Sequence, residues 1–287
     1  MSELKVLRRM TKWGIVFFVG ITSICASGPA QSQETAARLT ATEVMVKSNK
    51  AFYYAGADMK TEVTMELETR DGKKRTRVLT MLRMNDPKST AQKYYIYFHE
   101  PADVRRMTFL VWKYPEKEDD RWIYVPAVDL VRRIASSDAR SSFVGSDFTY
   151  EDVSGRDLDA DTHTLLREEK LGEKDCYVVE SVPKETIDYV KRISWIDKAT
   201  FLSLKEEYYD LQNELARLFT ADDVKEVPAG ESSGGPTVPM VIRRTMKNVK
   251  SGHLTQVTFT SVSYNVGLDD DIFTERYLRR APSKWIK

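Results

Sequence analysis

The sequence predicts a mainly β protein, built as one domain around a strongly curved or barrel-like antiparallel sheet. Apolar residues alternate with polar ones along most of the chain, and turn signals separate these runs at roughly even spacing. Only one long stretch, near the N-terminus, has helical periodicity instead. A length of 287 residues allows one large domain or two small ones, and we expect one because no repeat or linker interrupts the strand pattern.

The composition excludes several classes of protein. A content of 41% hydrophobic and 30% charged residues rules out a disordered chain and a polytopic membrane protein. The formal net charge of +1 argues against a nucleic-acid-binding protein, which usually carries a basic face. Three His and two Cys leave little material for a zinc site or a disulfide framework, so we expect no metal and no cofactor.

Residues 1–33 have the features of a cleavable signal peptide. Four basic residues and one acidic residue precede an apolar or small run of thirteen, residues 13–25, and further small residues follow. As a helix this run spans roughly 20 Å, less than the roughly 30 Å hydrocarbon core of a bilayer. Cleavage after Ala30 or Ser32 leaves residues 34–287 as one exported domain, and the net charge changes from +1 to −2.

Two alternatives to cleavage remain open at this stage. One is an uncleaved N-terminal anchor, and the other is lipidation at Cys25, although Ile24 is bulkier than the small residue expected before a lipidated Cys. The cleaved chain keeps one cysteine, Cys176, and therefore has no internal disulfide.

Residues 40–55 are predicted to form an amphipathic helix. Thr40 and Glu43 have the spacing of a capping box, and apolar or small residues follow at positions 44, 48, 51, 52 and 55. Gly56 is a suitable C-cap.

From residue 63 the periodicity changes to two, which indicates strands. Residues 63–67 and 75–84 flank the hairpin turn at Asp71 and Gly72. Further strand-like runs follow at residues 93–99, 107–114, 121–125, 128–134, 164–170, 176–182, 189–196, 202–209, 215–220, 238–249 and 254–264. Residues 228–239 are predicted to be a flexible loop, and residues 272–280 a last short helix capped by the acids at 269–271.

The sequence contains no familiar catalytic motif. The three His, at positions 99, 163 and 253, do not lie in an HExxH setting, and no GxSxG or P-loop sequence occurs. Acidic residues at 157, 159, 161 and 168 match positions 1, 3, 5 and 12 of a calcium loop, but Thr162 stands where the sharp turn needs Gly. We therefore expect a solvated acidic loop, no catalytic residue and no bound metal.

Aromatic and apolar residues are the remaining candidates for a binding site. Such residues usually fill a core, but a curved sheet that is too wide for its own side chains encloses a ligand cavity. The cavity candidates, taken from both faces of the strands because the register is open, are Phe109, Val111, Trp112, Tyr114, Trp122, Tyr124, Phe143, Phe148 and Tyr150.

Two segments carry a resemblance to a known family. They are the W-x-Y-x-P sequence at 122–126 and the G-S-D-F-x-Y-E-D sequence at 145–152, supported by residues 177–183 and 195–197. Over residues 40–280 the chain resembles the outer membrane lipoprotein-sorting proteins, which are distant relatives of the periplasmic carrier LolA. The resemblance implies a half-open antiparallel β-barrel of about eleven strands, closed by an N-terminal helix and short helices around an apolar cavity.

The resemblance also implies a function. It implies a non-enzymatic, monomeric periplasmic carrier that binds acyl chains of a lipoprotein or a lipid and moves them between the inner and outer membranes. An inner-membrane transporter of the RND or MMPL type and an outer-membrane acceptor are the partners that it implies. The identity of the cargo stays open.

Two further groups of residues are assigned to this expected cavity. Lid candidates on the helix at 40–55 are Met45, Phe52 and Tyr53, whose alternative role is ordinary capping of the sheet. Candidate charges at the cavity mouth are Arg132 and Arg133, which either bind a lipid phosphate or a partner's acids, or pair with Asp129 or Asp138.

Two other functions compete with carriage. A sensor or adaptor with the same fold would bind a membrane-anchored regulator and hold no exchangeable lipid. A lipid-head-group hydrolase would need a polar cluster inside the cavity, around His99 or His163.

Overall fold

The described part of the chain folds into thirteen strands and a few short helices. The strands are β1 (Asp58–Glu68), β2 (Lys74–Asn85), β3 (Gln92–Glu100), β4 (Thr108–Lys113), β5 (Asp120–Val125), β6 (Leu130–Ile134), β7 (Asp161–Leu171), β8 (Lys174–Pro183), β9 (Tyr189–Asp197), β10 (Ser203–Asp210), β11 (Leu215–Pro228), β12 (Thr237–Asn248) and β13 (Leu254–Tyr264). The helices are α1 (Ala41–Tyr53), α2 (Tyr150–Ser154) and α3 (Arg276–Arg279), with single 3₁₀ turns η1 (Pro126–Val128), η2 (Ser136–Asp138), η3 (Phe143–Gly145), η4 (Leu158–Ala160) and η5 (Asp270–Ile272). This computed structural model describes residues 38–230 and 236–287, so the predicted signal peptide lies outside the described residues.

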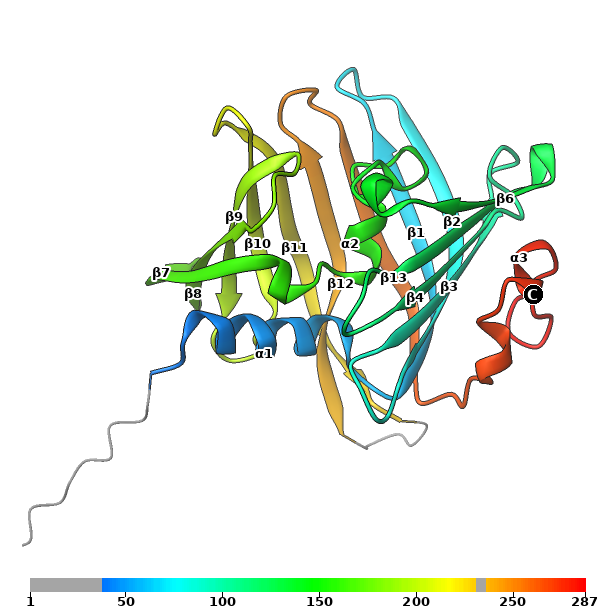
Figure 1. The fold of residues 1–287 in the computed structure, drawn as a ribbon, viewed down its shortest axis with the longest axis horizontal. Coiled ribbons are helices and arrows are strands. Elements are labelled where there is room, and N and C mark those ends of the chain that lie inside the picture. The colour runs from blue at the N-terminus through cyan, green and yellow to red at the C-terminus, as the bar shows by residue number, and fades with distance from the viewer. Residues whose placement is uncertain (1–37, 231–235) are drawn as a thin grey trace, which may run out of the picture. The chain divides into compact units, whose positions relative to one another are not determined.

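All thirteen strands belong to one antiparallel sheet that curves around a central segment of chain (Figure 1). Its order is β6-β5-β4-β3-β2-β1-β13-β12-β11-β10-β9-β8-β7. The edge strands β6 and β7 do not pair with each other in the described part of the chain, so the sheet is half open. The predicted fold class is therefore confirmed. The count of about eleven strands that the resemblance implied was slightly too low, whereas the strand-like runs predicted from the periodicity include one for each of the thirteen strands.

α1 forms where the capping pattern predicts it. The Glu43 amide donates to Thr40 Oγ1 at 3.2 Å, and the Thr40 amide donates to Glu43 Oε2 at 2.8 Å. The helix ends at Tyr53 with Tyr54 as its C-cap, two residues before the predicted cap Gly56. Gly56 has a φ of +69°, and a Cβ there would lie 2.9 Å from the Tyr264 ring, so the residue is needed for the turn into β1.

Both ends of α1 are fixed to the sheet. At its start, Val44 and Met45 pack against Val179 of β8 and Ile196 of β9. At its end, the buried Arg83 of β2 donates to the carbonyl of Tyr53, at 2.5 Å, and to that of Ala55. A cation at the C-terminus of a helix satisfies carbonyl groups that have no partner inside the helix. α1 therefore spans the open side of the curved sheet, below α2 in Figure 1.

We expect Thr40→Ala to lower the free energy of unfolding by about 1 kcal/mol, because it removes the N-cap acceptor. The change is measured by urea denaturation with fluorescence detection. Thr42→Ala is the matched control, since Thr42 is exposed in the same helical turn. An equal loss in both variants would show that the capping box adds nothing to stability.

The segment between β6 and β7 crosses the concave side of the sheet. It contains α2, whose N-cap Thr149 forms a capping box with Asp152. α2 ends at Gly155, which has a φ of +80° and at which a Cβ would lie 2.9 Å from the Tyr53 ring. A residue without a side chain is thus needed where α2 and α1 approach each other.

The C-terminal segment covers the outer face of β2–β5. Leu268, Phe273 and Leu278 pack against side chains of this face. Trp112 Nε1 donates to the Phe273 carbonyl at 2.7 Å, and Thr108 Oγ1 donates to the Leu278 carbonyl at 2.8 Å. The predicted single helix at 272–280 is corrected to η5 followed by α3, because these contacts use backbone carbonyls that a continuous helix would bond internally.

β11 is longer than predicted. Its ladder with β12 continues past Thr220 to Pro228 through two register shifts at Asp223. These irregularities accommodate the adjacent acids Asp222 and Asp223, which interrupt the alternating pattern. Among residues 38–230 and 236–287, no helix has the length and apolar character that crossing a bilayer requires.

Candidate functional site

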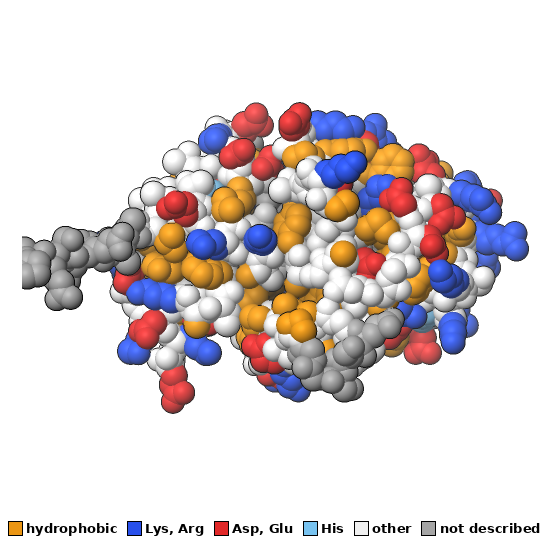
Figure 2. Space-filling view, turned by 90° about the horizontal axis from the view of Figure 1, so that it is seen from below, with side chains coloured by type: hydrophobic (Ala, Val, Ile, Leu, Met, Phe, Trp, Pro, Cys, Tyr) orange, Lys and Arg blue, Asp and Glu red, His pale blue; other side chains and the backbone are white. Residues whose placement is uncertain are grey.

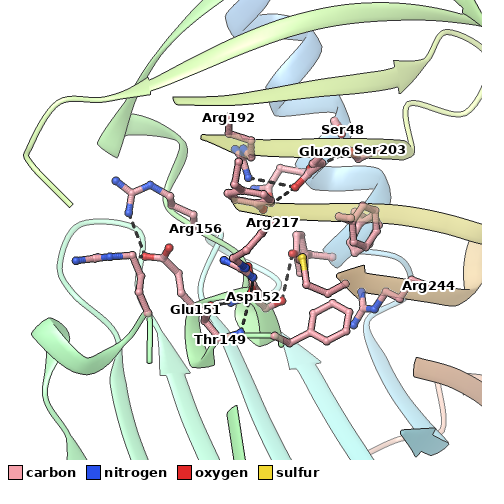
Figure 3. A pocket seen from close by; sticks show the side chains of 18 of the residues that line it. Ser48, Thr149, Glu151, Asp152, Arg156, Arg192, Ser203, Glu206, Arg217 and Arg244 are labelled. Carbon is pink, nitrogen blue, oxygen red and sulfur yellow. Dashed lines mark hydrogen bonds and ion pairs between the residues drawn. The ribbon is translucent and has the colours of Figure 1, made fainter. Parts of the chain in front are cut away.

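A hollow of about 820 Å³, counting its space open to solvent, lies between α1, α2 and strands β9–β12. α1 contributes Met45, Ser48, Phe52 and Tyr53 to its wall, and the opposite wall is made by inward-facing side chains of four strands (Figure 3). We call this space the polar hollow, because charged side chains make up much of its lining.

Four arginines of the polar hollow are held by carboxylates. Arg156 bonds Glu151 at 3.1 Å and Asp161 at 2.9 Å. The remaining pairs are Arg192 with Glu206 at 3.7 Å, Arg140 with Asp188 at 2.7 Å, and Arg217 with Asp152. Such paired charges are stable in a partly buried wall because each desolvated cation has an anion beside it.

Burial and ion pairing act in opposite directions on these groups. Burial raises the pKa of the Glu151 carboxyl above its ordinary value, although Arg156 beside it acts in the opposite direction. Burial disfavours the charge of Arg217, but Asp152 outweighs this effect and raises the pKa of that guanidinium. The network is consequently a structural one, in which a carboxylate lies beside each of these four guanidinium groups.

Two smaller apolar hollows adjoin the polar hollow beneath the concave face. One, of about 520 Å³ counting its space open to solvent, lies between the end of α1 and Met59, Met81 and Met240, with Arg83 also in its wall. The other, of about 370 Å³ counted in the same way, lies between α2 and the side chains of Val63, Leu79 and Val257. We call them the apolar hollows; Arg244 borders both of them and the polar hollow.

Five of the nine predicted cavity residues lie together in the concave core. They are Phe109, Val111, Phe143, Phe148 and Tyr150. The Phe109 ring lies 5.3 Å from that of Phe143 and 5.2 Å from that of Tyr150, so the crossing segment fills the space in front of β4. Phe148 also lines the polar hollow, and Phe143 and Phe148 line the smaller apolar hollow.

The other four lie on the outer side of the sheet. Trp112, Trp122 and Tyr124 belong to the cluster beneath the C-terminal segment. Tyr114 borders a surface groove and donates to Asp120 at 3.0 Å. Neighbouring residues of a strand point to opposite faces, which explains the division.

The lid and mouth candidates are separated in space. Met45, Phe52 and Tyr53 all line the polar hollow, and the Phe52 ring lies 6.1 Å from that of Phe219 on β11. Arg132 and Arg133 are exposed on the edge strand β6 and border none of the three hollows. Arg133 pairs with Asp120.

The G-S-D-F-x-Y-E-D segment positions the crossing segment. Asp147 accepts from Thr255 Oγ1 and from His253 Nδ1, both at 2.7 Å, and so fixes the segment to the start of β13. Thr149 and Asp152 cap α2. The motif therefore has a structural role that places Phe148 and Asp152 in the wall of the hollow.

The residues of the suggested hydrolase and calcium loop are engaged elsewhere. His99 bonds Thr80 at 2.8 Å and His163 bonds Ser181 at 2.9 Å, and neither lines the polar hollow. Asp161 faces Arg156 and Arg192. No cluster of potential metal ligands occurs within the described ranges.

Sequence reasoning missed the charged wall of the polar hollow. These charged residues include Arg192, Glu206, Arg217 and Arg244 on β9–β12, strands on which the sequence indicated no candidate site residue. A signal was present at residues 243–244, where two adjacent arginines on one strand must point to opposite faces.

Comparisons with known proteins agree with this fold. The profile of a family described as "Uncharacterized protein" matches residues 90–280. A DUF1329 family protein from Desulfovibrio piger is 28% identical, with a TM-score of 0.75 over 83% of this chain and 97% of that chain. A domain described as an outer membrane lipoprotein-sorting protein, from Vibrio parahaemolyticus, is 26% identical, with a TM-score of 0.74 over 84% of this chain and 98% of that chain.

A more distant structure shares the fold. A LolA superfamily protein from Nitrosomonas europaea is 20% identical, with a TM-score of 0.62 over 84% of this chain and 100% of that chain. No curated protein matches the sequence. The profile match covers most of the chain, and the structures that resemble it share one architecture. The chain therefore belongs to this family of proteins, and it shares its fold with the LolA superfamily structure.

Proposed function

We propose that this protein is a periplasmic carrier that binds the acyl chains of a lipoprotein or a lipid and moves them between the inner and outer membranes. Residues 1–33 are removed on export, and residues 34–287 act as one domain without catalytic activity. Cargo passes from an inner-membrane transporter of the RND or MMPL type to an outer-membrane acceptor.

The observation that carries this proposal is the pair of apolar hollows beneath α1. They lie under the concave face of a half-open sheet and share wall residues with the polar hollow, so the apolar and the polar parts of an amphipathic molecule would have adjacent places to bind. Hydrophobic side chains also reach the surface in several separate groups on the side seen in Figure 2, from below the view of Figure 1. The likeness to a lipoprotein-sorting domain supports the same function.

The energetics suit a carrier. Each CH₂ removed from water contributes about 0.8 kcal/mol, so a sixteen-carbon chain gains on the order of 10 kcal/mol before ordering costs. Transfer from a membrane is nearly balanced, because both environments are apolar. The carrier itself needs no nucleotide site, and the transporter and the acceptor set the direction.

The test is native mass spectrometry of the protein purified from periplasm without detergent, followed by lipid extraction. We expect a discrete added mass that resolves into a lipid, fatty acid or lipopeptide. A clean unliganded mass that persists after incubation with lipid vesicles would contradict carriage and favour the adaptor alternative.

A matched pair of variants locates the cargo. Val257→Phe places a larger side chain in the smaller apolar hollow, and we expect it to reduce the lipid-bound fraction severalfold. Val249→Phe makes the same change at an exposed position and should bind lipid normally. Unchanged lipid loading of Val257→Phe would show that the chain lies elsewhere. Circular dichroism checks folding, since overpacking costs about 1–3 kcal/mol.

A further inference from the structure

Arg244 is the one arginine in the wall of the polar hollow that has no carboxylate of the described residues within ion-pair distance, although Asp152 and Glu206 lie in the same wall. It makes no hydrogen bond or ion pair there, and in Figure 3 no dashed line reaches it. Its Nε is buried without a partner. An arginine stays charged and offers five N–H donors, so a half-buried guanidinium without an acceptor leaves strong donors unused.

Aromatic rings hold this guanidinium in place. Its central carbon lies 5.3 Å from the ring centroid of Phe52, 5.6 Å from that of Phe148 and 5.0 Å from that of Phe259. Cation–π contacts of this kind orient a cation without neutralising it. They come from α1, from the crossing segment and from β13, so three separate elements fix the position of Arg244.

The location of Arg244 distinguishes it from the paired arginines. It is the residue at which the polar hollow meets both apolar hollows. A molecule with an acyl chain in an apolar hollow would bring the polar end of that chain to this guanidinium. Guanidinium groups bind carboxylate and phosphate oxygens through paired N–H donors.

We propose that Arg244 binds the oxyanion of an anionic acyl lipid, either a carboxylate or a phosphate, and that the cargo is an anionic lipid rather than an uncharged acyl group. The acyl chains of a lipoprotein are linked through uncharged ester and amide groups, which supply no oxyanion for the Arg244 guanidinium. This inference rests on the proposed carrier function and specifies the cargo class for the same site.

The test compares ligands that share one chain and differ in head group. Dodecanoate, dodecyl phosphate and 1-dodecanol are titrated into delipidated protein by calorimetry at pH 8, where the carboxylate is ionised. We expect the wild-type protein to bind both anionic probes about tenfold or more tightly than the alcohol, the range for a charge-assisted hydrogen bond. Acetate and inorganic phosphate are titrated as head groups without a chain.

Two substitutions at adjacent positions separate the site from general charge. Arg244→Met should remove the preference for anionic probes and leave the affinity for 1-dodecanol unchanged within about twofold. Arg243→Met makes the same change on the exposed, opposite side of β12 and should keep the preference. Arg244→Lys retains a cation and should keep part of the preference for anionic probes. Urea unfolding checks that each variant folds.

The outcomes are distinct. Equal binding of the anions and the alcohol by the wild type, or a preference that survives Arg244→Met, overturns the assignment of Arg244 and leaves the carrier function standing. Binding of inorganic phosphate or acetate as tight as that of the anionic twelve-carbon probes overturns the assignment too, since the site would then recognise a free anion. If none of the three twelve-carbon probes, 1-dodecanol included, binds to the protein, the result would contradict the carrier function itself.

Discussion

Replacing Phe273 by alanine is expected to lower the free energy of unfolding by about 3–5 kcal/mol, the range for removal of a buried phenyl group. Phe273 is 0% exposed and joins the C-terminal segment to the outer face of the sheet. The cavity cannot collapse easily, because the Phe273 carbonyl accepts a hydrogen bond from Trp112 Nε1, which holds the segment at a fixed distance from β4. Urea denaturation measures the loss.

Leu211→Ala is the control for this prediction, since Leu211 is 56% exposed in the β10–β11 turn. We expect its stability to change by less than about 0.5 kcal/mol. A loss below about 1 kcal/mol for Phe273→Ala would show that the C-terminal segment is only loosely attached to the sheet.

Asp152→Ala is expected to cost about 2–4 kcal/mol of stability. The substitution removes the Asp152 half of the α2 capping box, in which the carboxylate accepts from the Thr149 amide, and it also leaves Arg217 in the wall of the hollow without its anion. A broken buried pair costs more than one lost capping bond. Adding Arg217→Met should recover part of the loss, because a methionine needs no counter-charge there.

Asp159→Ala serves as the matched control, since Asp159 is exposed in the same segment. Its unfolding midpoint should stay within experimental error of the wild type. If the double variant is no more stable than Asp152→Ala, the ion pair contributes little, and the cap accounts for the effect. Urea unfolding of the wild type, Asp152→Ala, Arg217→Met and the double variant gives the coupling energy.

The parts of the fold that local chemistry determines were predictable from the sequence. The capping residues Thr40 and Glu43 predict the start of α1, and alternation with the Asp71–Gly72 turn predicts the β1–β2 hairpin. The end of β11 was not predictable, because the pairing past Asp222 and Asp223 depends on β12 as a partner. The C-terminal helix was overestimated for a similar reason, since the outer face of the sheet decides its conformation.

The site was predictable only in its outline. The helix that borders the hollow was predicted together with Met45, Phe52 and Tyr53. The choice of strand faces was not, because a shift of one residue exchanges the two faces. Arg217 and Arg244 resemble solvent-facing residues in the alternating pattern. Only the curvature of the complete sheet brings these two arginines to the same wall. There Asp152, which is distant in sequence, lies beside Arg217.

The strand order has a consequence for how this chain reaches its folded state. β1–β6 and β7–β13 are two meanders in which each strand pairs with its neighbour in sequence, but the ladder between β1 and β13 joins residues near opposite ends of the chain, such as Met59 and Tyr264. Such non-local pairing slows folding, because loop closure is needed before the contacts can form. Until β13 is made, β1 presents an unpaired edge on which a second chain can assemble. The central position of β1 thus makes aggregation before completion of the chain the main hazard in its biogenesis.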